Sequence, residues 1–271
     1  MPRITRWATL LSMADGSTVQ AAFLAGSIAA GATVLGTLPA LFVHSISRRV
    51  QDALLGFGAG IMLAAASFSL VLPALVTAQR LGAGAWTSGL LVGLSLLVGA
   101  GLVMWVERVL PHEHFIKGPE GGDTRRIART WLFVFAIYLH NLPEGLAIGV
   151  SYAVDAAQGR VMATGIAIQD IPEGLVVALA LLSAGYGRRQ AILIGVASGL
   201  IEPVGAALGA STALASPWML PCGLGFAAGA MLFVVSHEII PESHRQGHEN
   251  FATPGLMLGF VLMMVMDTAL G

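Results

Sequence analysis

The feature that most restricts the fold of this sequence is a series of eight long apolar stretches. A helix that crosses the hydrocarbon core of a bilayer needs about 20 mainly apolar residues. The stretches are Val19–Val43, Ala53–Thr77, Ala85–Val106, Trp131–Val154, Val161–Ala184, Ala191–Leu214, Pro217–His237 and Phe251–Leu270. We therefore predict an all-α, polytopic membrane protein with eight transmembrane helices, because helices satisfy their own backbone groups in lipid.

The composition supports a membrane protein of one domain. Only 11% of the residues are charged, whereas soluble domains carry about 25%. The 34 glycines are typical of closely packed membrane helices. The net charge of −1 gives no basic surface for nucleic acid, so the lipid bilayer is the expected partner. No soluble domain fits between the spans, and residues 1–271 form a single transmembrane domain with one long loop at about 107–130.

The positive charges predict the orientation of the spans. If both termini lie outside, ten Lys and Arg residues fall in inner loops and four fall outside. The four are Arg3, Arg6, Arg80 and Arg160. The positive-inside rule therefore places both termini outside and the 107–130 loop in the cytoplasm.

Two pairs of similar segments indicate an internal duplication. Gly56–Ser67 and Gly225–Ser236 share seven of twelve positions, and His140–Gly145 resembles Gln169–Gly174. The members of each pair lie on oppositely directed spans, which predicts an inverted repeat of helices 1–3 and 6–8 around a central helix 4/5 pair. Gly-rich helices can resemble each other by chance, but the second pair matches at residues that are costly in a membrane.

Polar side chains gather in three central spans. They are His140, Asn141, Glu144, Gln169, Asp170, Glu173 and Glu202. An ionisable residue in hydrocarbon costs about 2.5–3.5 kcal/mol. Both motifs start about 14 Å into their spans at 1.5 Å per residue, so both reach the midplane. His140 and Glu144 share a helix face because they are four residues apart.

This set of side chains predicts a transition-metal site. The three spans contain no Lys or Arg, and carboxylates without a basic partner must be protonated or hold a cation. Imidazole, carboxylate and amide ligands suit Zn²⁺, and also Fe²⁺ or Mn²⁺, better than Na⁺ or K⁺. Each residue alone has a structural explanation: Asn141 or Gln169 could join helices, Glu202 could be a protonated acid, and His140 could be packed and neutral. Together they favour metal.

Three prolines accompany these acids. Pro143 and Pro172 each precede the motif glutamate, and Pro203 follows Glu202. A proline inside a helix removes an N–H and frees a carbonyl group. We therefore expect kinks beside the acids.

The strings HNLPEGLAIG, QDIPEG and EPVG in spans 4, 5 and 6 resemble the ZIP (Zrt-/Irt-like protein) family of divalent metal-ion transporters, bacterial branch. The resemblance covers nearly the whole chain. It implies uptake of divalent transition metal, typically zinc, with Cd²⁺, Fe²⁺ or Mn²⁺ as alternatives, into the cytoplasm across the inner (plasma) membrane.

The resemblance also implies a binuclear site. One metal position would use His140, Glu144, Gln169 and Glu173. The other would use Asn141, Asp170 and Glu202, with Glu144 and Glu173 bridging the two ions.

The two ends of the path differ. The duplication aligns Phe68 and Ser69 of span 2 with His237 and Glu238 of span 7. Imidazole and carboxylate are metal ligands, so we predict that His237 and Glu238 capture metal at a cytoplasmic exit. The alternative is a solvated helix end. The roles of Asp267 and of the His112/His114 loop stay open.

Other functional classes fit less well. A membrane metalloprotease would show HExxH on a helix, and this string does not occur. A lipid-phosphate hydrolase would need Arg or Lys near its site. A transporter of organic solutes would be expected to have an aromatic-lined cavity, but aromatic residues make up 7% of the chain. We therefore predict a transporter that is not an enzyme, and leave a homodimer open.

Overall fold

The structure is a computed structural model that describes residues 16–43, 45–109, 112–114, 118–120, 129–183, 186–244 and 247–270, with side chains outside 110–140 and 183. Within this part of the chain, seven helical runs are long and apolar enough to cross a membrane. The helix α6 (Arg129–Val154) adds an eighth long run of 26 residues. The chain is thus a multi-pass α-helical membrane protein, as predicted.

The first half of the chain contains three spans. They are α2 (Gly16–Thr37) with the short helix η1 (Leu38–Leu41), then α3 (Arg48–Ala64), the π-helical segment η2 (Ala65–Val71) and α4 (Leu72–Arg80), then α5 (Ala85–Val109). Two strands, β1 (His112–His114) and β2 (Gly118–Glu120), pair antiparallel between α5 and α6. The predicted long loop therefore contains a small hairpin.

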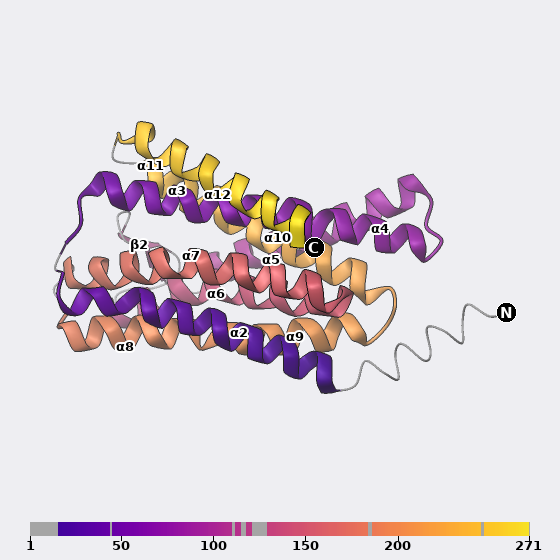
Figure 1. Ribbon diagram of the computed structural model, residues 1–271, viewed down its shortest axis with the longest axis horizontal. Helices are drawn as coiled ribbons and strands as arrows, with labels where there is room; N and C mark the ends of the chain where they lie inside the picture. The colour runs from indigo at the N-terminus through magenta and orange to yellow at the C-terminus, as the bar shows by residue number, and fades with distance from the viewer. Residues whose placement is uncertain are drawn as a thin grey trace.

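The second half contains five spans. They are α6, α7 (Ala156–Ser183), α8 (Arg188–Gly199) with α9 (Ile201–Leu214), α10 (Met219–Val234) with the π-helical η4 (Val235–Ile239) and α11 (Ile240–His244), and α12 (Glu249–Leu270). The start of α2 and the α4–α5 turn lie at one end of the bundle, and the start of α8 and α11 lie at the other (Figure 1). By the charge argument above, the first of these is the predicted outer end.

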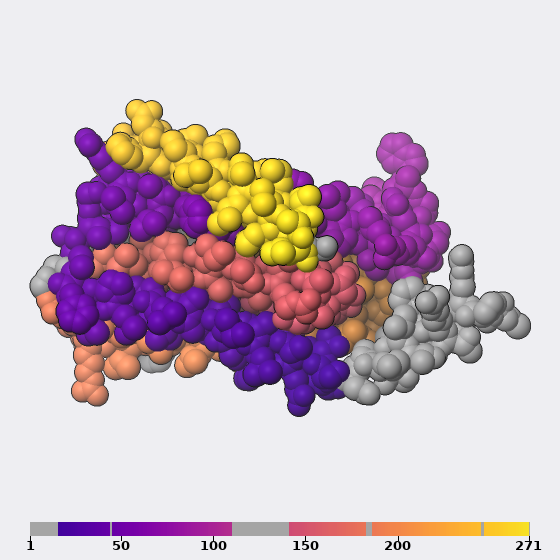
Figure 2. Space-filling view, viewed as in Figure 1, coloured from indigo at the N-terminus to yellow at the C-terminus, as the bar shows by residue number. Residues whose placement is uncertain are grey.

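The helices pack into two groups. α2, α6, α7 and α9 pack against one another, and the second group pairs α3 with α12 and α5 with α10. Figure 2 shows α12 lying across α3, with α7 and then α2 beside them on the same face. The groups meet where α10 contacts α6 and where α3 contacts α7.

One close contact between a glycine and a carbonyl group occurs in both halves of the sequence. A Cβ atom at Gly60 would overlap the carbonyl oxygen of Leu256, and one at Gly229 would overlap that of Leu96. Gly229 follows Gly60 by 169 positions, the interval of the repeated segments, and Leu256 follows Leu96 by 160. The contact between spans 2 and 8 is therefore repeated between spans 7 and 3. This recurrence supports the predicted inverted repeat.

The helices depart from the expected outlines at their prolines. α6 and α7 continue through Pro143 and Pro172. The span that carries Glu202 is divided instead, because α8 ends at Gly199 and α9 begins at Ile201. Of the three prolines beside the acids, only Pro203 therefore lies next to a break between two helices. This break places Glu202 in the first turn of α9.

Candidate metal centre

The structure brings the predicted midplane residues together within one helix group. Asn141 and Glu144 come from α6, Gln169 and Asp170 from α7, and Glu202 from α9. All five are at most 2% exposed. Glu173, also on α7, is half-buried. The side chain of His140 lies outside the described part of the structure.

Three carboxylates meet at the contact between α6 and α7. One oxygen each from Glu144, Asp170 and Glu173 lies within 4.8 Å of the other two. The amide nitrogen Nε2 of Gln169 donates hydrogen bonds to Glu144, to Asp170 at 3.3 Å and to Glu173 at 3.2 Å. The amide hydrogens thus occupy the space between the acids. A divalent cation fits this space chemically, because carboxylate oxygens are its preferred hard ligands.

Glu202 forms the other side of the cluster. Its Oε1 accepts hydrogen bonds from Asn141 Nδ2 at 3.2 Å and from the Thr33 hydroxyl of α2 at 3.3 Å. Glu202 Oε2, Asn141 Oδ1 and Asp170 Oδ2 are buried without a hydrogen-bond partner among the described residues. Buried oxygens of this kind are rare because they cost free energy. They are the atoms that a bound cation would satisfy.

The glycine of each PEG motif permits this geometry. A Cβ atom at Gly145 would overlap the carbonyl oxygen of Glu202, and one at Gly174 would lie 2.5 Å from that of Thr33. α9 can therefore approach α6, and α2 can approach α7, only because these residues have no side chain. The motif thus supplies a candidate ligand and, in the next residue, the close helix contact beside it.

At the predicted inner end, His237 and Glu238 lie within η4. The helix continues through α11 to His244, so these residues lie within about two turns of its end. His237 Nε2 lies 3.4 Å from Glu107 Oε1 of α5, and its ring stacks on Phe233. Glu238 is 8% exposed. The His237 imidazole and the Glu107 carboxylate therefore lie together in the second helix group.

At the predicted outer end, Ser69 and Asp267 are joined directly. The Ser69 hydroxyl donates to Asp267 Oδ1 at 2.5 Å. Ser69 precedes Glu238 by 169 positions, and Glu107 precedes Asp267 by 160. In the predicted repeat, Ser69 and Asp267 thus correspond to Glu238 and Glu107.

Sequence reasoning missed Thr33 and Glu107. Thr33 lies 169 positions before Glu202, so extending the interval of the repeat to span 1 would have marked it. Glu107 was counted as part of a loop, although α5 continues to Val109 and buries it. Both omissions concern residues that the duplication relates to a polar residue already identified.

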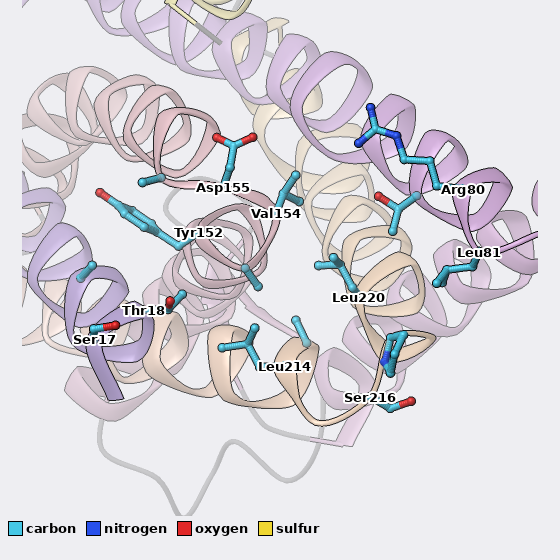
Figure 3. Close-up of a pocket in the computed structure, with 16 residues that line it drawn as sticks. Ser17, Thr18, Arg80, Leu81, Tyr152, Val154, Asp155, Leu214, Ser216 and Leu220 are labelled. Atoms are coloured by element: carbon cyan, nitrogen blue, oxygen red, sulfur yellow. The ribbon is translucent and has the colours of Figure 1, made fainter. Parts of the chain in front are cut away.

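A separate cavity of about 510 Å³ opens at the predicted outer end, lined by residues of α2, α4, α6, α9 and α10 and of the turns before α5, α7 and α10. Figure 3 shows Arg80 and Asp155 at its margin and Val154, Leu214 and Leu220 around its centre. None of the predicted metal ligands lines it. Its apolar walls and its arginine are unsuited to a metal cation.

Comparisons with known proteins agree with this geometry. The family described as ZIP zinc transporter matches residues 107–267. A zinc transporter named ZIPB from Bordetella bronchiseptica is 51% identical over 251 residues, which cover 92% of this chain and 81% of that protein. The zinc transporter GufA from Myxococcus xanthus is 44% identical over 252 residues, covering 93% and 99%. The zinc transporter ZIP11 from Xenopus tropicalis is 30% identical, covering 96% and 100%.

The matched region includes every polar residue of the central cluster except Thr33. The buried carboxylates, the helix pairs around them and these similarities therefore lead to one assignment: the chain belongs to the ZIP family of membrane transporters and is not an enzyme.

Proposed function

We propose that the chain carries divalent transition metal, zinc first, from outside the cell into the cytoplasm through a binuclear site in α6, α7 and α9. The observation that carries the proposal is the buried meeting of Glu144, Asp170 and Glu173. The relatives named as zinc transporters support zinc as the cargo. Cd²⁺, Fe²⁺ and Mn²⁺ are the alternatives that the same ligand types accept.

The arrangement supports two adjacent metal positions. His140, Glu144, Gln169 and Glu173 would form one, and Asn141, Asp170 and Glu202 the other, with Glu144 and Glu173 shared. Glu202 with Asn141 lies on the α9 side, whereas Gln169 lies among the α7 acids. Two ions there would neutralise carboxylates that could not stay charged and unpaired in the bilayer.

Direction follows from the two ends of the path. With both termini outside the plasma membrane, Ser69 and Asp267 lie on the outer side, and His237, Glu238 and Glu107 lie on the cytoplasmic side. The inner set contains an imidazole and one more carboxylate than the outer set, and these are stronger zinc ligands than a hydroxyl. We infer that the inner set receives the ion after it leaves the central site.

One experiment separates the central residues from the inner residues. Glu144→Ala or Glu173→Ala should abolish zinc uptake into vesicles and remove most bound metal. The double substitution His237→Ala with Glu238→Ala should slow uptake but leave metal in the central site, which lies about 15 Å away at half the hydrocarbon thickness.

The matched control is Glu249→Ala, an exposed acid at the start of α12, which should behave like the parent. Normal uptake by Glu173→Ala would overturn the central site. Complete loss of metal from the double variant would mean that the inner residues belong to the central site.

A further inference from the structure

A side chain of one helix group bonds to the backbone of the other near the predicted outer end. Gln158 lies in the first turn of α7, and its Nε2 donates to the carbonyl oxygen of Ser69 in η2 at 2.6 Å. α7 carries half of the candidate site, whereas η2 continues α3. The bond therefore joins the group that holds the carboxylates to the group that flanks it.

The sequence explains why this carbonyl group is available. In an α-helix the carbonyl of Ser69 would accept from the N–H of residue 73, but residue 73 is proline and has no N–H. The N–H of Leu72 bonds instead to Ser67, in the wider π-helical pattern. An unsatisfied carbonyl is costly in a membrane span, and Gln158 supplies a donor in place of the N–H that Pro73 lacks.

Ser69 is also fully enclosed by its neighbours. It is 0% exposed, its hydroxyl donates to Asp267, and the ring of the preceding Phe68 packs edge-on against Phe260 at 5.8 Å. The position that corresponds to Phe68 in the inner half is His237, whose side chain is 48% exposed. Phe68 is only partly exposed, so at this position the outer end is more enclosed than the inner end.

We propose that Gln158 is a latch that holds the outer end of the metal path closed, so that its bond to Ser69 must break before an ion enters from outside. The outward direction of this end rests on the proposed function. A hydrogen bond of this type changes an equilibrium constant by about fivefold. Because affinity scales with the fraction of molecules competent to bind, the latch lowers the apparent affinity for external zinc.

The test measures how often the outer end opens. Ser69→Cys is made with Cys222→Ser, which removes the other cysteine. The latch survives this change because Gln158 bonds to the backbone of residue 69. A membrane-impermeant thiol reagent is then applied from outside, and each labelling rate is divided by that of the same protein with Gln158 at the same pH.

Two substitutions distinguish a donor from a filler of space. Gln158→Leu cannot donate, and we expect about fivefold faster labelling at about pH 7.5 and at about pH 4.5. Gln158→Glu has the size of glutamine but donates only when protonated, which happens near its ordinary pKa of about 4.3. Its labelling should be fast at the higher pH and return toward the parent at the lower pH.

The control is Thr164→Val, an exposed position of α7 whose hydroxyl bonds only to its own helix, and it should leave labelling unchanged. Equal rates in the parent and both Gln158 variants would overturn the latch, as would pH-independent labelling of the glutamate variant. Labelling needs no zinc. If the Gln158 variants are labelled as expected but the protein takes up no zinc, the proposed function is refuted and the proposed role of Gln158 stands. For external zinc, KM should fall by up to fivefold in Gln158→Leu.

Discussion

At the scale of single residues, Gln169 shows how three acids of the candidate site share one hydrogen-bond donor. Its amide nitrogen faces the acids of α6 and α7, and its Oε1 points toward α3, where a Cβ atom at Gly58 would lie 3.3 Å away. To ligate an ion, the amide must turn so that its oxygen replaces its nitrogen, because only the oxygen accepts. The sequence named Gln169 as a ligand, but it could not reveal this orientation.

Removing this amide should destabilise the metal-free protein more than the zinc-bound protein. Gln169→Leu leaves the carboxylates without their shared donor, and hydrogen bonds to charged groups contribute about 1.5–3 kcal/mol. We expect a melting temperature lower by several degrees without metal, and a smaller difference in saturating zinc. Thermal unfolding in detergent measures both. Gln79→Leu, at an exposed position of α4, should change neither. An equal loss with and without zinc would contradict this role.

At the scale of helices, the sequence predicted the spans well and their interruptions poorly. Each of the eight apolar stretches overlaps a long helix, because apolar length alone determines whether a helix can cross a bilayer. The π-helical segments η2 and η4 could not be predicted, since they depend on which carbonyl finds a partner on another helix. The helix α7 is continuous at Pro172, whereas the span that contains Pro203 is divided beside it. The position of a proline alone therefore does not locate a break in a helix.

The glycine contacts between helices should tolerate no side chain. Gly229→Ala would push a methyl group into the carbonyl group of Leu96, and such overpacking costs about 1–3 kcal/mol. We expect a melting temperature lower by a few degrees. Gly93→Ala, on the same pair of helices, meets nothing within 4 Å and serves as the control. If both variants have the same melting temperature, the α5–α10 contact is looser than described.

At the scale of the whole molecule, the candidate metal ligands and the proposed ends of the metal path belong to different helix groups. The central carboxylates lie on α6, α7 and α9, whereas Ser69 and Glu238 lie in spans of the other group. The sequence identified both sets of residues as candidates, since polar side chains stand out in apolar spans. It could not assign them to groups, because that depends on which helices pack together.

The proposed orientation is testable with reporter fusions. Alkaline phosphatase, which folds only outside the cytoplasm, should be active when fused after the last residue, Gly271. It should be inactive when fused after Gly187, in the turn before α8 that carries Arg188 and Arg189. The excess of positive charge on one side is the physical reason. The reverse pattern would invert the proposed direction of zinc movement, and comparable expression of both fusions is the control.

The recurring glycine contacts also bear on how such a protein can diverge after gene duplication. At Gly60 and Gly229 any larger residue collides with backbone, so mutation there is opposed in both halves alike. Positions outside these contacts face no such restriction, and there the halves differ, as with Ser69 and Glu238. A duplicated ancestor with two identical ends could thus acquire unlike ends by a few side-chain replacements, without any change to its backbone.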